Sequence, residues 1–194
     1  MDFSELALKT RSYRRFDQTA AIEPSTLRGL IDLVRRVPSA ANRQPLRYVA
    51  SCGPAMNRQI FGTLSWAGAL PDWPGPSEGE RPAAYVVILH DRNVCEAAPT
   101  DVGIAAQTLL LAAVSMGLGG CMFGAVARPR LHEILGLPAD LEIMLVVALG
   151  KPVERVVLED ALPGASLKYY RDADQTHHVP KRRLQDVLLR TITE

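Results

Sequence analysis

The sequence is poor in cysteine, in lysine and in long apolar runs. Its 194 residues include three cysteines, Cys52, Cys95 and Cys121, an odd number without CxxC spacing, so no disulfide framework is expected. Only 4 of the 22 basic residues are Lys, and the 21 acidic residues leave a formal net charge of +1. A charge this close to zero excludes a chain-wide basic surface, and we expect neither nucleic acid nor a membrane surface as a partner.

No segment has the length of a membrane span. The apolar stretch around residues 108–114 is interrupted by Asp101, Gln107 and Ser115, and falls short of the roughly 20 residues that cross a bilayer. The first ten residues are too acidic, and their apolar run is too short, for a signal peptide. We therefore expect a soluble protein of the reducing cytoplasm, folded as one domain over residues 1–194.

Helical and strand patterns alternate along the chain. Leu27, Leu30, Ile31 and Val34 have the spacing of one buried helix face, which predicts a helix from Pro24 to about residue 37. Further helices are predicted over 2–9, 101–116 and 130–135, and strands over 47–52, 84–90 and 142–149. The strand at 84–90 is apolar throughout and should be buried on both faces. Such alternation predicts an α+β or α/β sandwich in three layers.

The helix over residues 101–116 is apolar almost all round. A monomer of this size rarely buries such a helix completely, so we expect an oligomer interface along one side, with Ile104, Leu110 and Leu111 as candidate contacts. Gly117 should end the helix. The Gly-rich turn that follows is compatible with a plain helix C-cap or with backbone N–H groups that approach a planar ligand.

Signatures of metal sites and of hydrolases are incomplete. His132 and Glu133 begin a zinc-protease motif, but Gly136 stands where the second His ligand is needed, so no metal site is predicted. His177 and His178 lie in a polar tail without a matching set of carboxylates or thiols, and we interpret them as solvated. The tail after Pro163 is expected to be either frayed or docked on a partner chain.

Two polar segments could bind an anion. Residues 11–15, Arg-Ser-Tyr-Arg-Arg, gather three guanidinium groups and a hydroxyl, a set that suits a phosphate dianion or, alternatively, a solvated basic turn. Residues 38–45, Pro-Ser-Ala-Ala-Asn-Arg-Gln-Pro, form a donor-rich loop with Pro at both ends.

Together with the long apolar helix and the Gly-rich turn, these segments resemble the nitroreductase family of FMN-dependent oxidoreductases. The likeness also rests on Ala-Leu-Gly-Lys-Pro at 148–152 and His-Val-Pro-Lys-Arg at 178–182, and spans nearly the whole chain. It implies an α+β fold, a three-layer sandwich with a mixed sheet flanked by helices. It also implies a homodimer formed through the apolar helix, with each FMN in the dimer interface.

The resemblance distributes the flavin contacts over two subunits. Arg11 and Ser12 are expected to hold the phosphate and ribityl end, and Arg14 to approach the N1/O2 edge of the isoalloxazine, where a cation stabilises the reduced flavin. The other subunit is expected to contribute residues of its loop at 38–45. The Gly-rich turn is expected to place its backbone near N5, and the tail is expected to place two cations at the phosphate. These further cofactor-binding residues are Pro38, Ser39, Asn42 and Gln44, then Met122, Phe123 and Gly124, and finally Lys181 and Arg182, with Arg183 as a substitute for either cation.

The implied activity is NAD(P)H-dependent reduction of a nitroaromatic, a quinone or a similar small acceptor by ping-pong hydride transfer. No side chain is expected as a general acid or base, since N5 of the flavin carries the hydride. Leu46 and Met122 stand where the family often has aromatic residues. Residues 53–82 match nothing in the family pattern and are interpreted as a mobile lid that sets selectivity, and residues 164–194 as a tail docked on the partner subunit. The alternative is a flavin-binding module with a sensing or carrier role.

Overall fold

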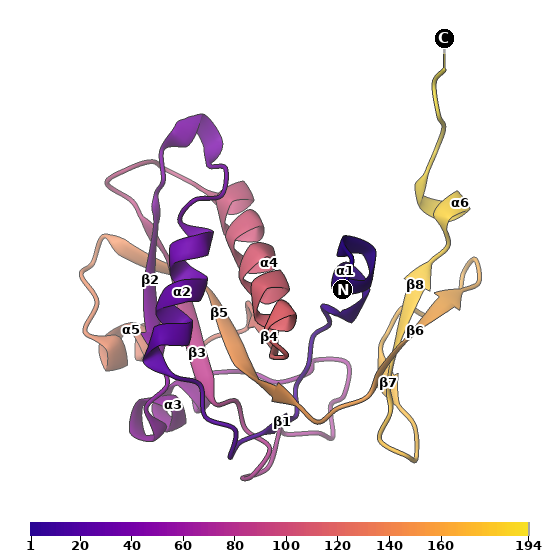
Figure 1. The fold of residues 1–194 in the computed structure, drawn as a ribbon, viewed down its shortest axis with the longest axis horizontal. Helices are drawn as coiled ribbons and strands as arrows, with labels where there is room; N and C mark the ends of the chain where they lie inside the picture. The colour runs from indigo at the N-terminus through magenta and orange to yellow at the C-terminus, as the bar shows by residue number, and fades with distance from the viewer. Residues whose placement is uncertain (194) are drawn as a thin grey trace. The chain divides into compact units, whose positions relative to one another are not determined.

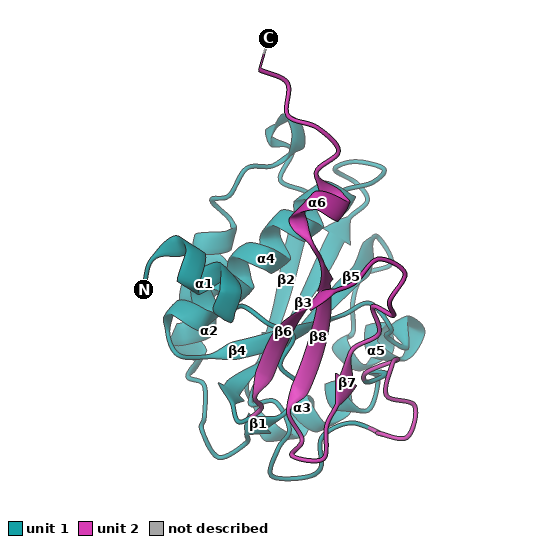
Figure 2. Cartoon of the chain, turned by 90° about the vertical axis from the view of Figure 1, so that its right-hand side faces the viewer, with its two compact units in different colours: residues 1–66, 75–153 teal, residues 67–74, 154–194 magenta. Residues whose placement is uncertain are grey.

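The computed structural model describes residues 1–193, which divide into two compact units (Figure 2). Unit 1 comprises residues 1–66 and 75–153, and unit 2 comprises residues 67–74 and 154–194. Each unit is described by itself. The prediction of one domain over 1–194, with a mobile lid at 53–82 and a docked tail at 164–194, stays a prediction.

Unit 1 is built on an antiparallel sheet flanked by helices (Figure 1). Its strands are β1 (Phe16–Asp17), β2 (Leu46–Ser51), β3 (Ala84–Asp91), β4 (Gly119–Phe123) and β5 (Leu141–Pro152). Their order is β1-β5-β3-β2, and β4 also pairs with β5. The helices are α1 (Phe3–Lys9), α2 (Pro24–Val34), the 3-10 turn η1 (Ala40–Asn42), α3 (Pro54–Phe61), α4 (Pro99–Ser115) and α5 (Arg128–Leu135).

Side chains of β3 alternate between two apolar layers, as a strand buried on both faces requires. Ala84, Val86 and Ile88 belong to the core cluster that includes residues of α2 and α4. Tyr85 and Val87 point to the opposite face and are 1% and 0% exposed. The predicted three-layer α+β sandwich is therefore confirmed.

The prediction that the main sheet combines parallel and antiparallel strands is wrong, and such a mixed sheet is found in unit 2 instead. All strand ladders of unit 1 are antiparallel, and a single parallel bridge joins Ser12 to Gly120. Unit 2 contains a small mixed sheet of β6 (Val156–Ala161), β7 (Tyr170–Arg171) and β8 (His177–Arg182), followed by α6 (Leu184–Val187). Here β6 and β8 are parallel, and β7 and β8 are antiparallel. The tail is thus not frayed at 177–182.

Most predicted elements are confirmed to within a few residues. Helix α2 ends at Val34, earlier than predicted, because the N–H groups of Arg36 and Val37 donate to carbonyls three residues back, a tighter 3-10 turn that leads to Pro38. Helix α4 ends at Ser115, and Gly117 adopts a positive φ of 79°, the left-handed conformation that glycine provides after a helix. Gly117 thus follows the C-cap residue Met116 and ends the helix, as predicted, whereas the approach of backbone N–H groups to a planar ligand stays a prediction.

Candidate functional site

The Arg-rich segment lies beside the start of β4. Helix α1 ends at Lys9, and the chain then runs extended past the sheet. Ser12 forms a parallel bridge with Gly120, and the Tyr13 N–H donates to the Gly120 carbonyl at 2.9 Å. A Cβ at Gly120 would stand 2.4 Å from the Ala148 carbonyl oxygen, so this position requires glycine. The structure therefore brings the Arg-rich segment and the Gly-rich turn together.

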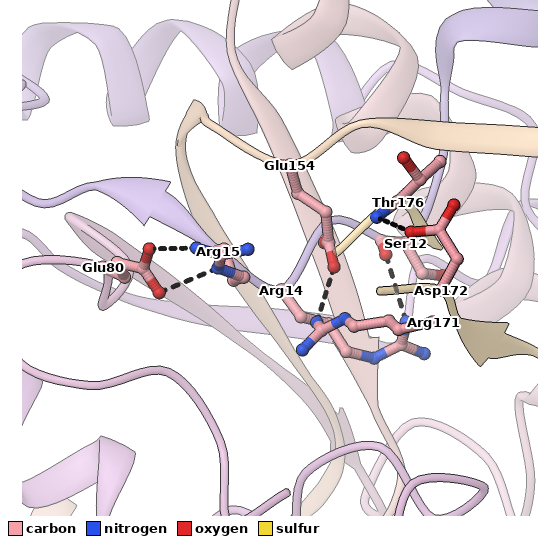
Figure 3. Close-up of polar contacts among 8 residues, drawn as sticks. All are labelled: Ser12, Arg14, Arg15, Glu80, Glu154, Arg171, Asp172 and Thr176. Atoms are coloured by element: carbon pink, nitrogen blue, oxygen red, sulfur yellow. Dashed lines mark hydrogen bonds and ion pairs between the residues drawn. The ribbon is translucent and has the colours of Figure 1, made fainter. Parts of the chain in front are cut away.

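The arginines of this segment have different surroundings. Arg15 makes two hydrogen bonds to Glu80, from Nε at 2.8 Å and from Nη2 at 2.5 Å, a bidentate pair with a structural role (Figure 3). Arg14 is 9% exposed and donates from Nη1 to the Ser12 carbonyl at 3.2 Å. Burial of a cation is costly, so the segment is not a fully solvated turn.

Arg11 is the arginine with unused hydrogen-bonding capacity. Its Nη2 donates to the Ala7 carbonyl at 2.9 Å, which fixes the guanidinium against α1. Its Nε is buried and has no hydrogen-bond partner among residues 1–193. A buried donor without an acceptor is unfavourable, and an anion bound here would supply the acceptor. Arg11 thus fits the predicted contact to a phosphate.

Residues 119–123 form strand β4 and not the predicted turn. Met122 pairs with Val147, and Phe123 pairs with Val146. Across the described chain, β4 forms a ladder with β5 alone, and its other edge is bridged by Ser12 at Gly120, so the backbone groups on that edge beyond Gly120 point away from the sheet. This edge, continuing to Gly124, could offer the backbone donors that the resemblance expects. The Phe123 ring itself packs edge-on against Trp66, with the ring centres 4.6 Å apart.

The loop at 38–45 is held by its own side chains. The Ser39 hydroxyl accepts from the Gln44 N–H at 2.9 Å, and the Gln44 side-chain amide donates to Asn42 Oδ1 at 3.1 Å. Asn42 and Gln44 have positive φ values of 52° and 51°. Pro38, Ser39 and Gln44 line a hollow of about 180 Å³ beside β2. Four predicted site residues therefore lie together.

Asp101 is a residue that sequence reasoning missed. It lies in the first turn of α4, is 4% exposed, and accepts hydrogen bonds from the Ser39 hydroxyl at 2.5 Å and from the Ala40 N–H at 3.0 Å. Burial, and after it the charge of Asp101, raises the pKa of Tyr48 in the same hollow. An acidic residue in an otherwise apolar helix was the available signal.

The two groups of predicted contacts lie at opposite ends of α4 (Figure 1). The first turn of α4 holds the loop at 38–45 through Asp101, whereas the chain after its C-terminus leads directly to Gly120 and the Arg-rich segment. A helix of 17 residues is about 25 Å long. Within one chain, the structure does not bring the loop to Arg11, Ser12 and Arg14.

Lys181 and Arg182 end strand β8 in unit 2, and both are exposed. Among residues 1–193, neither side chain forms a hydrogen bond or an ion pair. Arg183 donates from Nε to Asp186 at 3.0 Å. Of the three candidate cations, Lys181 and Arg182 are thus the two available for a ligand.

The prediction that the tail histidines are solvated is wrong. His177 is 1% exposed. His178 lies between two carboxylates, with Nδ1 2.5 Å from Glu159 and Nε2 3.0 Å from Asp172. Hydrogen bonds to these carboxylates, Asp172 first, raise the pKa of His178. This group of His178 and two carboxylates could not be predicted from the sequence, because Glu159 is 19 residues away and contacts His178 through the parallel pairing of β6 and β8.

Comparison with known sequences places the chain among flavin and nicotinamide oxidoreductases by similarity. An NADPH-flavin oxidoreductase of Vibrio harveyi is 40% identical over 65 residues, 32% of this chain and 27% of that protein. An NADH dehydrogenase of Thermus thermophilus is 28% identical over 191 residues, 84% of this chain and 93% of that protein.

Solved structures share the fold. A nitroreductase family protein from Streptococcus pneumoniae superposes with a TM-score of 0.66 at 17% identity and covers 84% of this chain and 96% of its own. One from Clostridium difficile gives 0.65 at 20% identity, covering 79% and 86%. A sequence model described as the nitroreductase family matches residues 7–151. The chain therefore belongs to the nitroreductase family.

Proposed function

We propose that the chain is an FMN-dependent oxidoreductase that takes electrons from NADPH or NADH. Family membership supports this assignment, as do relatives named for NADPH-flavin and NADH chemistry and a structural neighbour named an FMN-dependent nitroreductase. The observation that carries it in this structure is the buried Arg11 Nε without an acceptor, beside Ser12 and Arg14. When bound, FMN would accept a hydride from the nicotinamide and pass electrons to an acceptor.

The residues present fit this group. Arg11 and Ser12 would hold its phosphate and ribityl end, with Lys181 and Arg182 as further cations, because guanidinium groups pair well with phosphate oxygens. Arg14, which donates a hydrogen bond to the Ser12 carbonyl, would place positive charge at the edge of the ring system. The free edge of β4 at Met122 and Phe123, with Gly124 directly after it, would supply backbone donors.

The active assembly would be a homodimer, as the placement of the site residues supports. The loop at 38–45 and the Arg-rich segment lie at opposite ends of α4, so two α4 helices packed antiparallel would bring the loop of one chain to the Arg11 of the other. Apolar side chains are also exposed at the chain ends, with Phe3 at 73% and Leu184 at 72%. A partner chain would cover such surface.

A nitroaromatic or a quinone is the acceptor that we propose. Donor and acceptor would use the same face of the ring system in turn, which gives ping-pong kinetics. Among residues 1–193, no helix is long and apolar enough to cross a membrane. We propose that the enzyme acts in the cytoplasm, as its free cysteines allow.

The visible spectrum tests this proposal. The purified protein should be yellow, release FMN on denaturation as identified by mass, and be bleached anaerobically by NADPH or NADH. Steady-state oxidation of NAD(P)H with a quinone should then follow. A colourless protein that fails to take up FMN would overturn the proposal, and a flavin that nicotinamides do not reduce would indicate a sensing or carrier module.

A further inference from the structure

A second hollow lies within unit 1, and its lining residues differ from those proposed to hold FMN. Its volume is about 300 Å³, at the lower end for small-molecule sites. Its walls come from α3, from residues 78–83, and from Gln18, Cys52 and Tyr85, and it shares no residue with the predicted flavin contacts. The proposed function therefore leaves this hollow unexplained.

Arg81 gives the hollow a positive charge that no carboxylate neutralises. Its Nε is buried and without a hydrogen-bond partner in the described chain, and no ion pair involves its guanidinium there. Its neighbour Glu80 is already occupied by the bidentate pair with Arg15 (Figure 3). Arg58 of α3, also without an ion pair in residues 1–193, adds a second guanidinium. Glu78 also lines the hollow, but it is exposed and forms no ion pair within residues 1–193.

Arg81 is held in place without its charge being compensated. The guanidinium carbon stands 4.4 Å from the centre of the Phe61 ring, a cation–π contact. The backbone N–H of Arg81 donates to Gln18 Oε1 at 3.2 Å. Because both ends of the residue are fixed, its side chain would lose little freedom on binding a ligand, which favours affinity.

The remaining walls combine donors with apolar surface. Burial raises the pKa of Tyr85, so its phenol stays protonated and able to donate. Asn57 is held by the Ser51 hydroxyl and by the Ala83 carbonyl, and serves as a fixed wall. Phe61 and several Ala and Pro side chains provide the apolar part.

We propose that this hollow binds a small organic anion that carries one carboxylate on an apolar body. A carboxylate matches the planar donor set of a guanidinium and would satisfy the buried Nε of Arg81. The apolar body would lie against Phe61 and the neighbouring small side chains. This second site is independent of the flavin and of its nicotinamide donor.

Benzoate is the probe for this site, and the protein as purified is the sample. Calorimetry should show benzoate binding, and amide shifts in ¹H–¹⁵N spectra should concentrate at residues 52–61 and 78–85. The neutral isostere benzamide should bind about tenfold more weakly or worse, because the charge-assisted bond is lost. Inorganic phosphate at the same concentration should not displace benzoate.

Arg81→Gln should weaken benzoate binding about 10- to 100-fold, and Arg58→Gln, on the exposed face of α3, should weaken it in the same direction. Arg130→Gln on α5, exposed and outside the hollow, is the control of equal charge change and should leave affinity within about twofold. FMN content and NAD(P)H oxidation should stay unchanged in all three variants, which separates this test from that of the proposed function. Shifts centred on the Arg11 segment, equal binding of benzamide, or unchanged affinity in both pocket variants would overturn the proposal.

Discussion

Asp101 fixes a loop that would be unfavourable by itself. Ala41, Asn42 and Gln44 all have positive φ values between 51° and 52°, a conformation that costs a non-glycine residue energy unless its surroundings impose it. Those surroundings are the two hydrogen bonds from Ser39 and Ala40 to the buried carboxylate. The shape of the predicted cofactor loop therefore depends on a residue outside it.

Asp101→Asn should reduce the free energy of unfolding by about 1.5–3 kcal/mol, because one charge-assisted hydrogen bond is lost in a buried site. Urea denaturation measures the change. Asp32→Asn is the matched control, since the Asp32 side chain on α2 is 48% exposed and, among residues 1–193, pairs with Arg35 and Arg36 alone; exposed pairs contribute little. Equal destabilisation by both substitutions would show that Asp101 has no special role.

Arg11→Ala should weaken FMN binding about 10- to 100-fold, the effect of one charge-assisted contact. Fluorescence titration of the apoprotein with FMN gives the dissociation constant. Arg28→Ala on the exposed face of α2 removes the same charge at a distance and should have no effect. If the dissociation constant is the same in the Arg11 variant and the parent, the buried Nε faces something other than the cofactor.

The small sheet of unit 2 is held by a histidine between carboxylates. Besides its contacts to Glu159 and Asp172, His178 stacks on Tyr170 with ring centres 4.7 Å apart, and the Tyr170 hydroxyl donates to Glu159. One side chain thus links β8 with β6, with β7 and with the turn after β7. Its protonation should govern the stability of this sheet.

The stability of this sheet should fall as pH rises through the folded pKa of His178. That pKa is raised above the ordinary value of 6.5, so its contribution is complete below about 6.5 and is lost at higher pH. The pKa of Asp172 is lowered, chiefly by the hydrogen bond to His178, so its contribution is lost in acid below its ordinary value of 3.8. The sheet should be most stable between these limits.

Imidazole titration by NMR and urea denaturation from pH 5 to 9 measure this effect. His178→Gln should flatten the stability profile above pH 6, whereas His132→Gln on α5, whose ring contacts a backbone carbonyl and, within residues 1–193, no carboxylate, should retain the slope. A folded-state pKa at or below 6.5 for His178 would contradict the argument.

Local patterns predicted the elements that depend on local sequence. Helix α2 has its apolar spacing and β3 its apolar run, and both are confirmed. Strands β4 and β8 were missed, because Gly119 and Gly120 lack strand propensity and Pro180 lies within β8. Both strands form through pairing with distant segments, namely β5 for one and β6 for the other. Tertiary contacts outweigh propensity there.

In the candidate site, too, some features could be predicted from local sequence and others could not. The Arg-rich segment and the loop at 38–45 could be predicted because their residue types and order match a family pattern. Neither the pairing of Arg15 with Glu80 nor the role of Asp101 could be predicted, since these partners are 65 and 62 residues apart. Sequence order carries no direct signal for such contacts.

Helix α4 packs in the core of its own chain and also carries the candidate contacts of the proposed dimer interface. Of the three interface candidates, Leu110 is 4% exposed and belongs to the core cluster of its own chain, so it is unsuited to test an interface: a charge there would unfold the monomer. The same side chain lies against Gly120. Ile104 and Leu111 are only partly buried and remain as candidate contacts.

Ile104→Glu and Leu111→Glu should each dissociate the dimer and release FMN together, although every proposed cofactor residue stays intact. A carboxylate at either position would be buried without a partner in the interface, at a cost of several kcal/mol. Because the loop at 38–45 and the Arg-rich segment lie at opposite ends of α4, a helix of 17 residues that is about 25 Å long, we expect that a monomer cannot complete the site. Light scattering gives the mass, and absorbance gives the ratio of flavin to protein. Leu33→Glu on α2, 48% exposed, adds the same charge elsewhere and should leave both values unchanged; a folded monomer with stoichiometric FMN would show that one chain builds the whole site.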